Sequence, residues 1–242
     1  MCQRTDEWYL ARKGKITASE AYVLLNNHKE QMTDDELAEY KTANPKSKVT
    51  TKEVPFNDST YTYLKRRVAE QFMSDRSYLD DVYDKHPFNR AIDWGVQWES
   101  DARKMFEAAL DVRVTEVGFI PLEQAPEIAG GSPDGLIDYL PKKVIIEIKC
   151  PWNSEIHQDY CLFKTAEDLK EYNLQYYAQM QMNMLVTGAE FGYFVSFDPR
   201  LKINALKILR VQKDVAMCET LLERIYLAEK WIANRMEQII NS

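Results

Sequence analysis

The sequence predicts an α/β protein in which a central mixed β-sheet is flanked by α-helices. Residues 144–150, VIIEIKC, form a largely β-branched apolar run, as expected for a strand buried on both faces. Two further strand-like runs, AEFGYFVSF (189–197) and INALKILRV (203–211), follow a segment with helical spacing at 167–187. Strand and helix patterns therefore alternate in the second half of the chain, which is typical of a sheet covered by helices.

The composition predicts one globular domain spanning residues 1–242, because 45% of the residues are apolar and 12% are aromatic. The sequence holds no apolar run of about 18 residues and no apolar core of a signal peptide, so we expect a cytoplasmic protein without membrane contact. The four cysteines form no CxxC pair, which disfavours a zinc, iron–sulfur or disulfide framework. A net charge of −7 disfavours nonspecific coating of nucleic acid but is compatible with a basic channel.

The first half of the chain is predicted to be mainly helical. Thr17 and Glu20 have the spacing of a capping box, so a helix is expected from Ala18 to Asn27. Residues 28–58 are rich in polar and charged residues, which predicts a loop or a loosely packed insertion. Helical spacing returns at 59–73 and at 93–110. The apolar residues that predict the buried face of the second of these helices are Trp94, Trp98, Ala102, Met105 and Ala109.

Three consecutive strands are predicted in the middle of the chain. Residues 112–120, VRVTEVGFI, alternate like a strand, and residues 135–140 and 144–150 form a hairpin around Pro141. We therefore expect a three-stranded meander. A long amphipathic helix is predicted from about 213 to 240.

Charged residues interrupt the segment that otherwise suits a buried strand. Glu147 and Lys149 are two residues apart, so they project from the same face, and Asp134 lies one hairpin away in a Ser-Pro-Asp-Gly turn. Two carboxylates can hold Mg²⁺, and a lysine can orient or activate water and offset phosphate charge, as in metal-dependent nucleases. The same acid-x-Lys pattern at 39–41 and 168–170 has no apolar strand around it. A buried Glu147–Lys149 ion pair with a purely structural role is the alternative.

Several motifs, taken in order, resemble one known family. They are DEWYLARKGKITASEA (6–21), WGVQWESDARKMFE (94–107), GGSPDGLI (130–137), IIEIKCPW (145–152), YYAQMQMNM (176–184) and YFVSFDPR (193–200). This set is similar to the lambda exonuclease family, also called the YqaJ-type viral recombinase nucleases, within the PD-(D/E)xK superfamily. The resemblance implies a restriction-endonuclease-like core with a central mixed sheet flanked by helices.

The resemblance implies a role for each residue of the charged group. Asp134 and Glu147 match the metal-binding carboxylates, and the main-chain carbonyl of Ile148 would add an oxygen ligand. Lys149 matches the catalytic lysine. Glu99 matches an acidic residue that reaches the site from a helix to bind a second metal or its water.

A glutamine and a second set of residues are implied as well. Gln179 matches a helical glutamine of the family, although a glutamine on a half-exposed helix is common without any function. Arg12, Ser19 and Ser132 match positions that hold the terminal 5′ phosphate of DNA. Arg12 precedes a helix start and Ser19 lies in its first turn, where backbone N–H groups and a guanidinium can converge on an anion.

The function implied is an exonuclease on double-stranded DNA that degrades one strand from its 5′ end and leaves a 3′ overhang. Two Mg²⁺ ions per site are expected, with Mn²⁺ as a substitute. The family resemblance also implies a homo-oligomeric ring, expected as a trimer, a single-strand annealing protein as partner, and phage-type recombination in a bacterial host. One departure is the acidic segment 153–160, where relatives tend to present a basic residue, which leaves DNA guidance there in doubt. An endonuclease on the same core and a noncatalytic DNA-binding relative remain alternatives.

Overall fold

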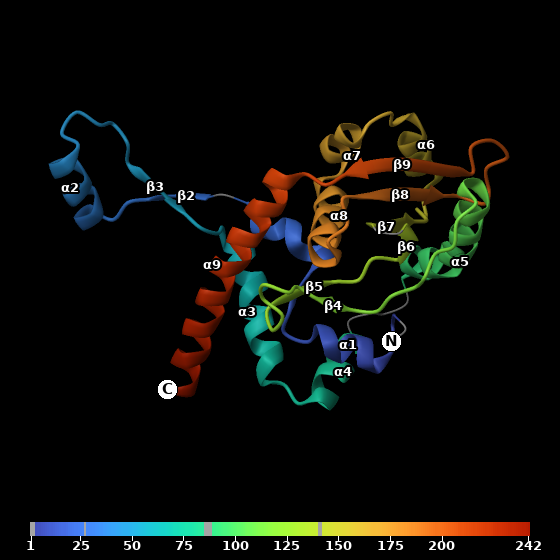
Figure 1. The fold of residues 1–242 in the computed structure, drawn as a ribbon. Coiled ribbons are helices and arrows are strands. Elements are labelled where there is room, and N and C mark those ends of the chain that lie inside the picture. Colours follow the sequence, from blue (N-terminus) through green and yellow to red (C-terminus); the bar gives the residue numbers. More distant parts are fainter. Residues whose placement is uncertain (1–2, 27, 85–88, 140–141) are drawn as a thin grey trace.

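A four-stranded sheet forms the centre of the computed structural model, with helices on both of its faces (Figure 1). The structure describes residues 3–26, 28–84, 89–139 and 142–242. The strands are β1 (Ile16–Thr17), β2 (His28–Gln31), β3 (Thr51–Val54), β4 (Ile120–Pro121), β5 (Ala129–Gly131), β6 (Gly135–Tyr139), β7 (Lys142–Lys149), β8 (Phe191–Phe197) and β9 (Leu206–Gln212). The helices are α1 (Asp6–Arg12), the 3₁₀ helix η1 (Ala18–Leu25), α2 (Asp34–Ala43), α3 (Asp58–Phe72), α4 (Asp75–Asp84), α5 (Arg90–Leu110), α6 (Ser154–Leu162), α7 (Ala166–Tyr172), α8 (Leu174–Thr187) and α9 (Val215–Ile240).

The central sheet is mixed, in the order β6-β7-β8-β9. The β6–β7 and β8–β9 pairs are antiparallel hairpins, and β7 pairs with β8 in parallel. A parallel pair requires a crossover connection, which α6, α7 and α8 supply. The predicted α/β fold with a mixed sheet between helices is therefore confirmed. A small second sheet, β1-β5-β4, lies beside η1.

Strand β7 is buried on both faces, and its alternating side chains enter two different apolar clusters. Ile145 packs with Met180 and Met184 of α8 on one face. Ile146 packs with Phe106 of α5 on the other. Because side chains alternate along a strand, Glu147 shares the face of Ile145 and points toward α8. Position 147 is therefore the point at which a buried strand presents a charge to a helix.

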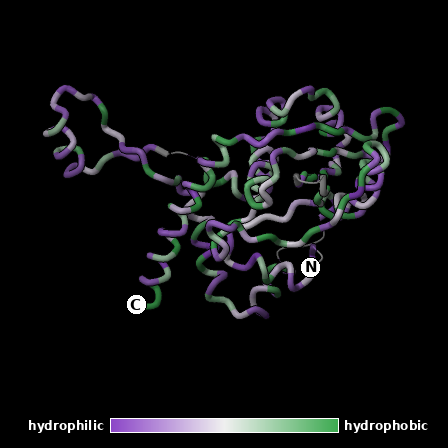
Figure 2. The backbone as a smooth tube through the Cα atoms, viewed as in Figure 1, coloured by the Kyte–Doolittle hydropathy of each residue, from purple (hydrophilic) through white to green (hydrophobic). Residues whose placement is uncertain are grey.

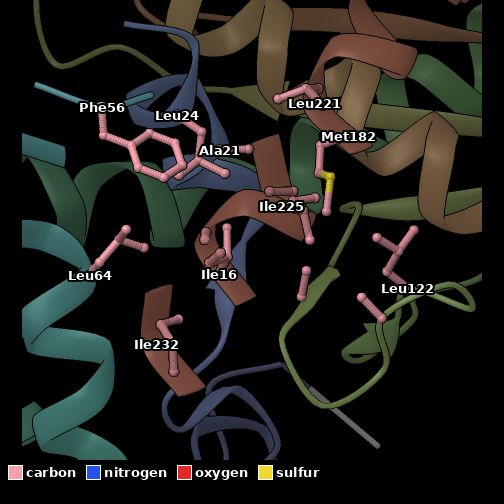
Figure 3. Close-up of a cluster of buried hydrophobic side chains, with 14 of the residues drawn as sticks. Ile16, Ala21, Leu24, Phe56, Leu64, Leu122, Met182, Leu221, Ile225 and Ile232 are labelled. Carbon is pink, nitrogen blue, oxygen red and sulfur yellow. The ribbon is translucent and has the colours of Figure 1, made fainter. Parts of the chain in front are cut away.

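A third apolar cluster joins the N-terminal half of the chain to the last helix. Figure 3 shows Ile16, Leu24, Leu64, Ile225 and Ile232 converging from β1, η1, α3 and α9. These five side chains are at most 1% exposed. The cluster fixes the segment 12–19 against the body of the protein, and this segment carries two of the residues predicted to bind phosphate.

Residues 28–54 project from the body as an antiparallel pair, β2 and β3, with α2 at its tip (Figure 1). Figure 2 shows this projection as predominantly hydrophilic, and α2 has no buried residue. The predicted insertion is confirmed, but it has regular structure rather than forming a loop. A reciprocal capping box at Thr33 and Glu36 explains the start of α2.

Four expectations about local structure are wrong. Residues 112–119 form no strand apart from one bridge between Thr115 and Leu136, so there is no three-stranded meander in the described chain. The helix at 167–187 is broken at Asn173 into α7 and α8. Met105 and Ala109 are exposed on α5, whose buried face centres on Ala102 and Phe106.

The fourth wrong expectation is the capping box at the start of η1. Thr17 is the N-cap residue, but its hydroxyl donates to the Glu20 carboxylate at 3.3 Å and makes no capping bond to backbone. Residue 27, the expected end of this helix, lies outside the described residues. Within the described parts of the chain, no helix combines the length and the apolar character needed to cross a membrane.

Candidate active site

The hairpin β6–β7 brings Asp134 close to β7, the strand that carries Glu147. Asp134 N donates to Ile146 O at 3.1 Å, which extends the β6–β7 pairing by one residue. The Asp134 side chain then turns back, and its Oδ2 accepts the backbone N–H of Ile148 at 2.6 Å. The backbone of β7 thereby fixes this carboxylate beside the strand.

Three donors surround the carboxylate of Glu147, which is 1% exposed. Oε1 accepts from Lys149 Nζ at 2.7 Å and from Gln179 Nε2 at 2.6 Å. Oε2 accepts from Asn183 Nδ2 at 3.1 Å. Lys149 Nζ also donates to Gln179 Oε1 at 3.2 Å and lies 4.5 Å from the ring centroid of Tyr176. Strand β7 and helix α8 therefore hold the carboxylate and the ammonium in fixed positions.

The charges of this group shift one another's pKa values. Burial, followed by repulsion from Glu147 and Glu99, holds the pKa of Asp134 well above its usual range. Burial also raises the pKa of Glu147, although Lys149 opposes the shift. For Lys149, burial would lower the pKa, but attraction to Glu147 and Asp134 outweighs it and the net shift is upward. Lys149 therefore stays protonated at neutral pH, as a cation and a hydrogen-bond donor.

Glu99 approaches the same site from α5, where two arginines hold its carboxylate. Oε2 accepts from Arg4 Nη2 at 2.6 Å, and Oε1 accepts from Arg103 Nη2 at 3.0 Å. Arg103 is nearly buried, donates to the main-chain oxygen of Asp134 at 3.4 Å and pairs with Glu116. Arg103 thus connects the helix that carries Glu99 to the turn that carries Asp134.

The residues predicted to bind phosphate come together from three parts of the chain. The Arg12 guanidinium lies 3.9 Å from the centroid of the Trp8 ring, and the Trp8 indole N–H donates to Ser132 Oγ at 3.0 Å. Ser19 Oγ lies 3.2 Å from Thr17 Oγ1. Burial lowers the pKa of Arg12. The guanidinium of Arg12 makes no hydrogen bond or ion pair with any other residue that the structure describes, so its charge is available to an anion.

All nine predicted site residues line a single cleft of about 690 Å³. They are Arg12, Ser19, Glu99, Ser132, Asp134, Glu147, Ile148, Lys149 and Gln179. The acidic residues and the residues predicted to bind phosphate were predicted separately, and they share one cleft. The start of α6, from the acidic segment 153–160, adds Asn153 and Ile156 to the wall.

Some cleft residues were not predicted from the sequence. Arg4 and Trp8 line the cleft from the N-terminal segment, and Tyr176 lines it from α8. Asn183 of α8 does not line the cleft but donates a hydrogen bond to Glu147. Asn183 and Tyr176 are one turn away from Gln179 in either direction, so helical spacing from Gln179 could have indicated them. Arg4 gave no such signal, because its partner Glu99 is 95 residues away.

The oxygen donors fit a hard divalent cation. Glu147 is buried and Asp134 is partly buried. Repulsion between them contributes to the raised pKa of Asp134, so a cation between them would relieve this repulsion. Carboxylate and carbonyl oxygens are the ligands that Mg²⁺ and Mn²⁺ favour. Among the described residues, no three His, Cys, Asp or Glu side chains form a complete metal-holding group. Glu99 is directed to Arg4 and Arg103 in this structure.

Comparison with known proteins identifies the family. The model of the YqaJ-like viral recombinase domain matches residues 7–190. The chain belongs to the YqaJ-like viral recombinase family. The family identification made from the sequence motifs is thereby confirmed, and residues 191–242, which include β8, β9 and α9, lie beyond the matched domain.

Solved structures share the fold of this YqaJ-like chain. An alkaline exonuclease from Laribacter hongkongensis, LHK-Exo, has 24% identity and a TM-score of 0.69, with 98% of this chain and 97% of that chain covered. LHK-Exo in complex with dAMP gives 24% identity, a TM-score of 0.68 and coverage of 97% and 96%. A phage related exonuclease from Haemophilus somnus 129PT has 15% identity, a TM-score of 0.60 and coverage of 93% and 96%. The predicted PD-(D/E)xK type of fold is confirmed by these likenesses. The search of curated proteins found no match.

Proposed function

We propose that this protein is a metal-dependent deoxyribonuclease that degrades one strand of duplex DNA from its 5′ end and leaves a 3′ single-stranded overhang. Membership of the YqaJ-like family supports a role in recombination, and the similar solved structures are exonucleases. Mg²⁺ is the proposed metal, with two ions per site, and Mn²⁺ is expected to substitute for it.

The observation that carries this proposal is the position of Arg12 in the cleft that also holds Asp134, Glu147 and Lys149. The guanidinium of Arg12 stacks on Trp8 and forms no ion pair with a residue that the structure describes. A guanidinium of this kind is well suited to a phosphate, which it can hold through two hydrogen bonds. An anion site beside a hydrolytic site favours cleavage at a DNA end over cleavage within the duplex.

The proposed chemistry is hydrolysis of the phosphodiester near the bound 5′ phosphate. Bound Mg²⁺ would supply Lewis acidity and lower the pKa of water. Asp134, Glu147 and the Ile148 carbonyl would hold one ion, and Glu99 a second ion or its water. Lys149, kept protonated by its carboxylate neighbours, donates hydrogen bonds and offsets negative charge that develops on the scissile phosphate. Gln179 forms hydrogen bonds with both Glu147 and Lys149 and holds their side chains in position.

Arg12, Ser19 and Ser132 would hold the terminal 5′ phosphate and so fix which bond reaches Lys149. We propose that the chain acts as a homo-oligomeric ring, with a trimer expected from the family resemblance, in the cytoplasm of a bacterial host. A ring would let an acidic protein stay on DNA, since only its channel needs to be positive. A single-strand annealing protein is the proposed partner.

The test is digestion of duplex DNA with a 5′ phosphate, with a 5′ hydroxyl or as a closed circle, with Mg²⁺ or with chelator. The proteins compared are the wild type, Lys149→Ala and the control Lys41→Ala, whose lysine lies exposed on α2. We expect metal-dependent loss of the 5′-phosphorylated strand by wild type and control, and none by Lys149→Ala. Cutting of the circle would instead identify an endonuclease, and binding without cleavage would identify a noncatalytic DNA-binding protein.

A further inference from the structure

A buried asparagine of α8 donates a hydrogen bond to the carboxylate of Glu147. Asn183 lies on α8 one turn after Gln179, is fully buried and donates from Nδ2 to Glu147 Oε2 at 3.1 Å. Its other amide atom, Oδ1, is also buried and has no hydrogen-bond partner among the described residues. An unpaired buried carbonyl oxygen is costly, so contacts elsewhere must hold the amide in this orientation.

Gly131 provides the space that the Asn183 amide occupies. A Cβ atom at position 131 would lie 2.4 Å from Asn183 Oδ1, which is far inside contact distance. The backbone of Gly131 is not in the left-handed region, so it is space rather than conformation that requires glycine there. Strand β5 and helix α8 therefore meet at these two residues, next to Ser132 of the cleft.

The two oxygens of Glu147 differ in their hydrogen bonding. Oε1 already accepts from Lys149 and Gln179, whereas Oε2 accepts from Asn183 alone. Each carboxylate oxygen has two lone pairs, so Oε2 is the atom that keeps an acceptor position for a cation. Asn183 is the single described side chain that fixes the direction of this oxygen.

We propose that Asn183, seated against Gly131, is a positioning residue that presents Glu147 Oε2 to the divalent metal. The proposal rests on the proposed function, because it assumes that Glu147 binds metal. Hydrogen bonds to metal-ligating side chains orient these ligands, and their loss typically weakens metal binding about 10–100-fold. The same hydrogen bond in a purely structural role would affect folding and leave metal affinity unchanged.

The main test measures Mn²⁺ binding by calorimetry, without DNA, for the wild type and Asn183→Leu. Leucine has the same branching and the same number of side-chain heavy atoms as asparagine but offers no donor, so it removes the hydrogen bond without opening a cavity. We expect the dissociation constant for Mn²⁺ to rise about 10–100-fold. The Mg²⁺ concentration for half-maximal cleavage should rise in parallel, while kcat at saturating Mg²⁺ should fall much less.

Gln181→Leu is the matched control. Gln181 is also a fully buried amide of α8, but it donates to Gln212 O at 3.0 Å and accepts from Asp214 N at 2.8 Å, away from the cleft. Both variants are expected to change the urea midpoint of unfolding. Only Asn183→Leu should change metal affinity, which separates positioning from a general effect on α8.

Gly131→Ala tests the same contact from the opposite side. The added methyl group would displace the Asn183 amide, so this variant should also weaken Mn²⁺ binding. In an Asn183→Ala background the clash with the amide is relieved, although a close approach to Ala18 Cβ at 3.3 Å remains. Gly131→Ala should then weaken Mn²⁺ binding little further, giving a non-additive double-mutant cycle. This variant keeps the proposal testable even if Asn183→Leu fails to fold.

The outcomes separate this inference from the proposed function. If the wild type binds Mn²⁺ and cleaves DNA, but Asn183→Leu binds it equally well or Gln181→Leu loses as much affinity, the positioning role is wrong and the nuclease stands. If the effects of Gly131→Ala and Asn183→Ala are additive, their contact does not control Oε2, and the role of Gly131 is wrong. If the wild type neither binds Mn²⁺ nor cleaves DNA, the nuclease proposal fails, and the positioning role fails with it.

Discussion

Replacing Lys149 by methionine is expected to destabilise the folded protein at neutral pH. The Glu147 side chain is 1% exposed and that of Lys149 is 20% exposed. The variant leaves a buried carboxylate whose remaining donors are the amides of Gln179 and Asn183. Removing one partner of a buried ion pair costs roughly 3–5 kcal/mol. We expect about 2–4 kcal/mol, because water in the cleft screens the exposed part of Lys149.

The sign of the pH dependence follows from the pKa of Glu147. Burial already raises this pKa above its ordinary value of 4.5, and loss of Lys149 raises it further. A folded carboxyl that holds its proton more tightly than the unfolded one loses stability as pH rises above the unfolded pKa. The destabilisation caused by Lys149→Met should therefore be largest near pH 8 and should diminish as the pH falls toward 4.5 and below.

Urea unfolding, followed by the fluorescence of the five tryptophans, provides the measurement at pH 8 and pH 5. The double variant Glu147→Gln/Lys149→Met should regain most of the lost stability at pH 8, because the buried charge of Glu147 is removed together with its partner, and should not cleave DNA. Equal losses by Lys149→Met at both pH values, or a double variant no more stable than the single one, would refute the electrostatic reasoning. DNA cleavage by the double variant would show that the pair is purely structural.

Three further predictions concern the surroundings of the acidic group. Arg4→Ala should strengthen Mn²⁺ binding in calorimetry about 2–5-fold, because Glu99 would no longer have to give up an ion pair worth up to about 1 kcal/mol to bind metal. Unchanged or weaker binding would show that Arg4 does not compete with metal for Glu99. Trp8→Phe removes the N–H that reaches Ser132, so it should lower the rate ratio for 5′-phosphorylated over 5′-hydroxyl DNA about 5-fold, and an equal loss on both substrates would exclude an end-specific role. Burial opposes ionisation of Asp198, but hydrogen bonds from an arginine and a serine outweigh it and lower its pKa to about 2. Its stability contribution is therefore full above pH 4 and is lost as pH falls toward 2, so urea unfolding at pH 7 should show Asp198→Asn to be about 1–2 kcal/mol less stable, with the difference vanishing near pH 2. A difference that persists at pH 2 would contradict this.

The hairpin at β6–β7 could be predicted because its signals are local. β-branched residues at 144–148 indicate a strand, and the Ser-Pro-Asp-Gly turn places Asp134 at the distance of one hairpin. The false strand at 112–119 was predicted from an alternation of apolar residues instead. Alternation reports which side chains are buried, and Val112 and Val114 do pack on the α5 cluster, but it does not report a pairing partner. Only Thr115 bridges to a neighbour, Leu136.

The contacts that complete the site depend on the tertiary structure. Gln179 could be named from its motif, whereas the contact between Asn183 and Gly131 joins residues 52 positions apart and depends on how β5 crosses α8. Arg4 reaches Glu99 only after the segment before α1 turns at Arg4, whose backbone is left-handed with φ 64°. No periodicity in the sequence predicts contacts of this kind.

The distribution of charge in the cleft is consistent with an enzyme that selects DNA ends despite a net charge of −7. Arg12 and Lys149 are at most partly exposed, and both line the cleft rather than the outer surface. A duplex approaching elsewhere meets a surface with an excess of carboxylates, such as the exposed Glu155 and Asp159 of α6. In the proposed function, a strand end that enters the cleft gains favourable electrostatic energy, because its phosphate can there reach these two cations. The proposed function therefore predicts weak binding along the duplex and tight binding at its end.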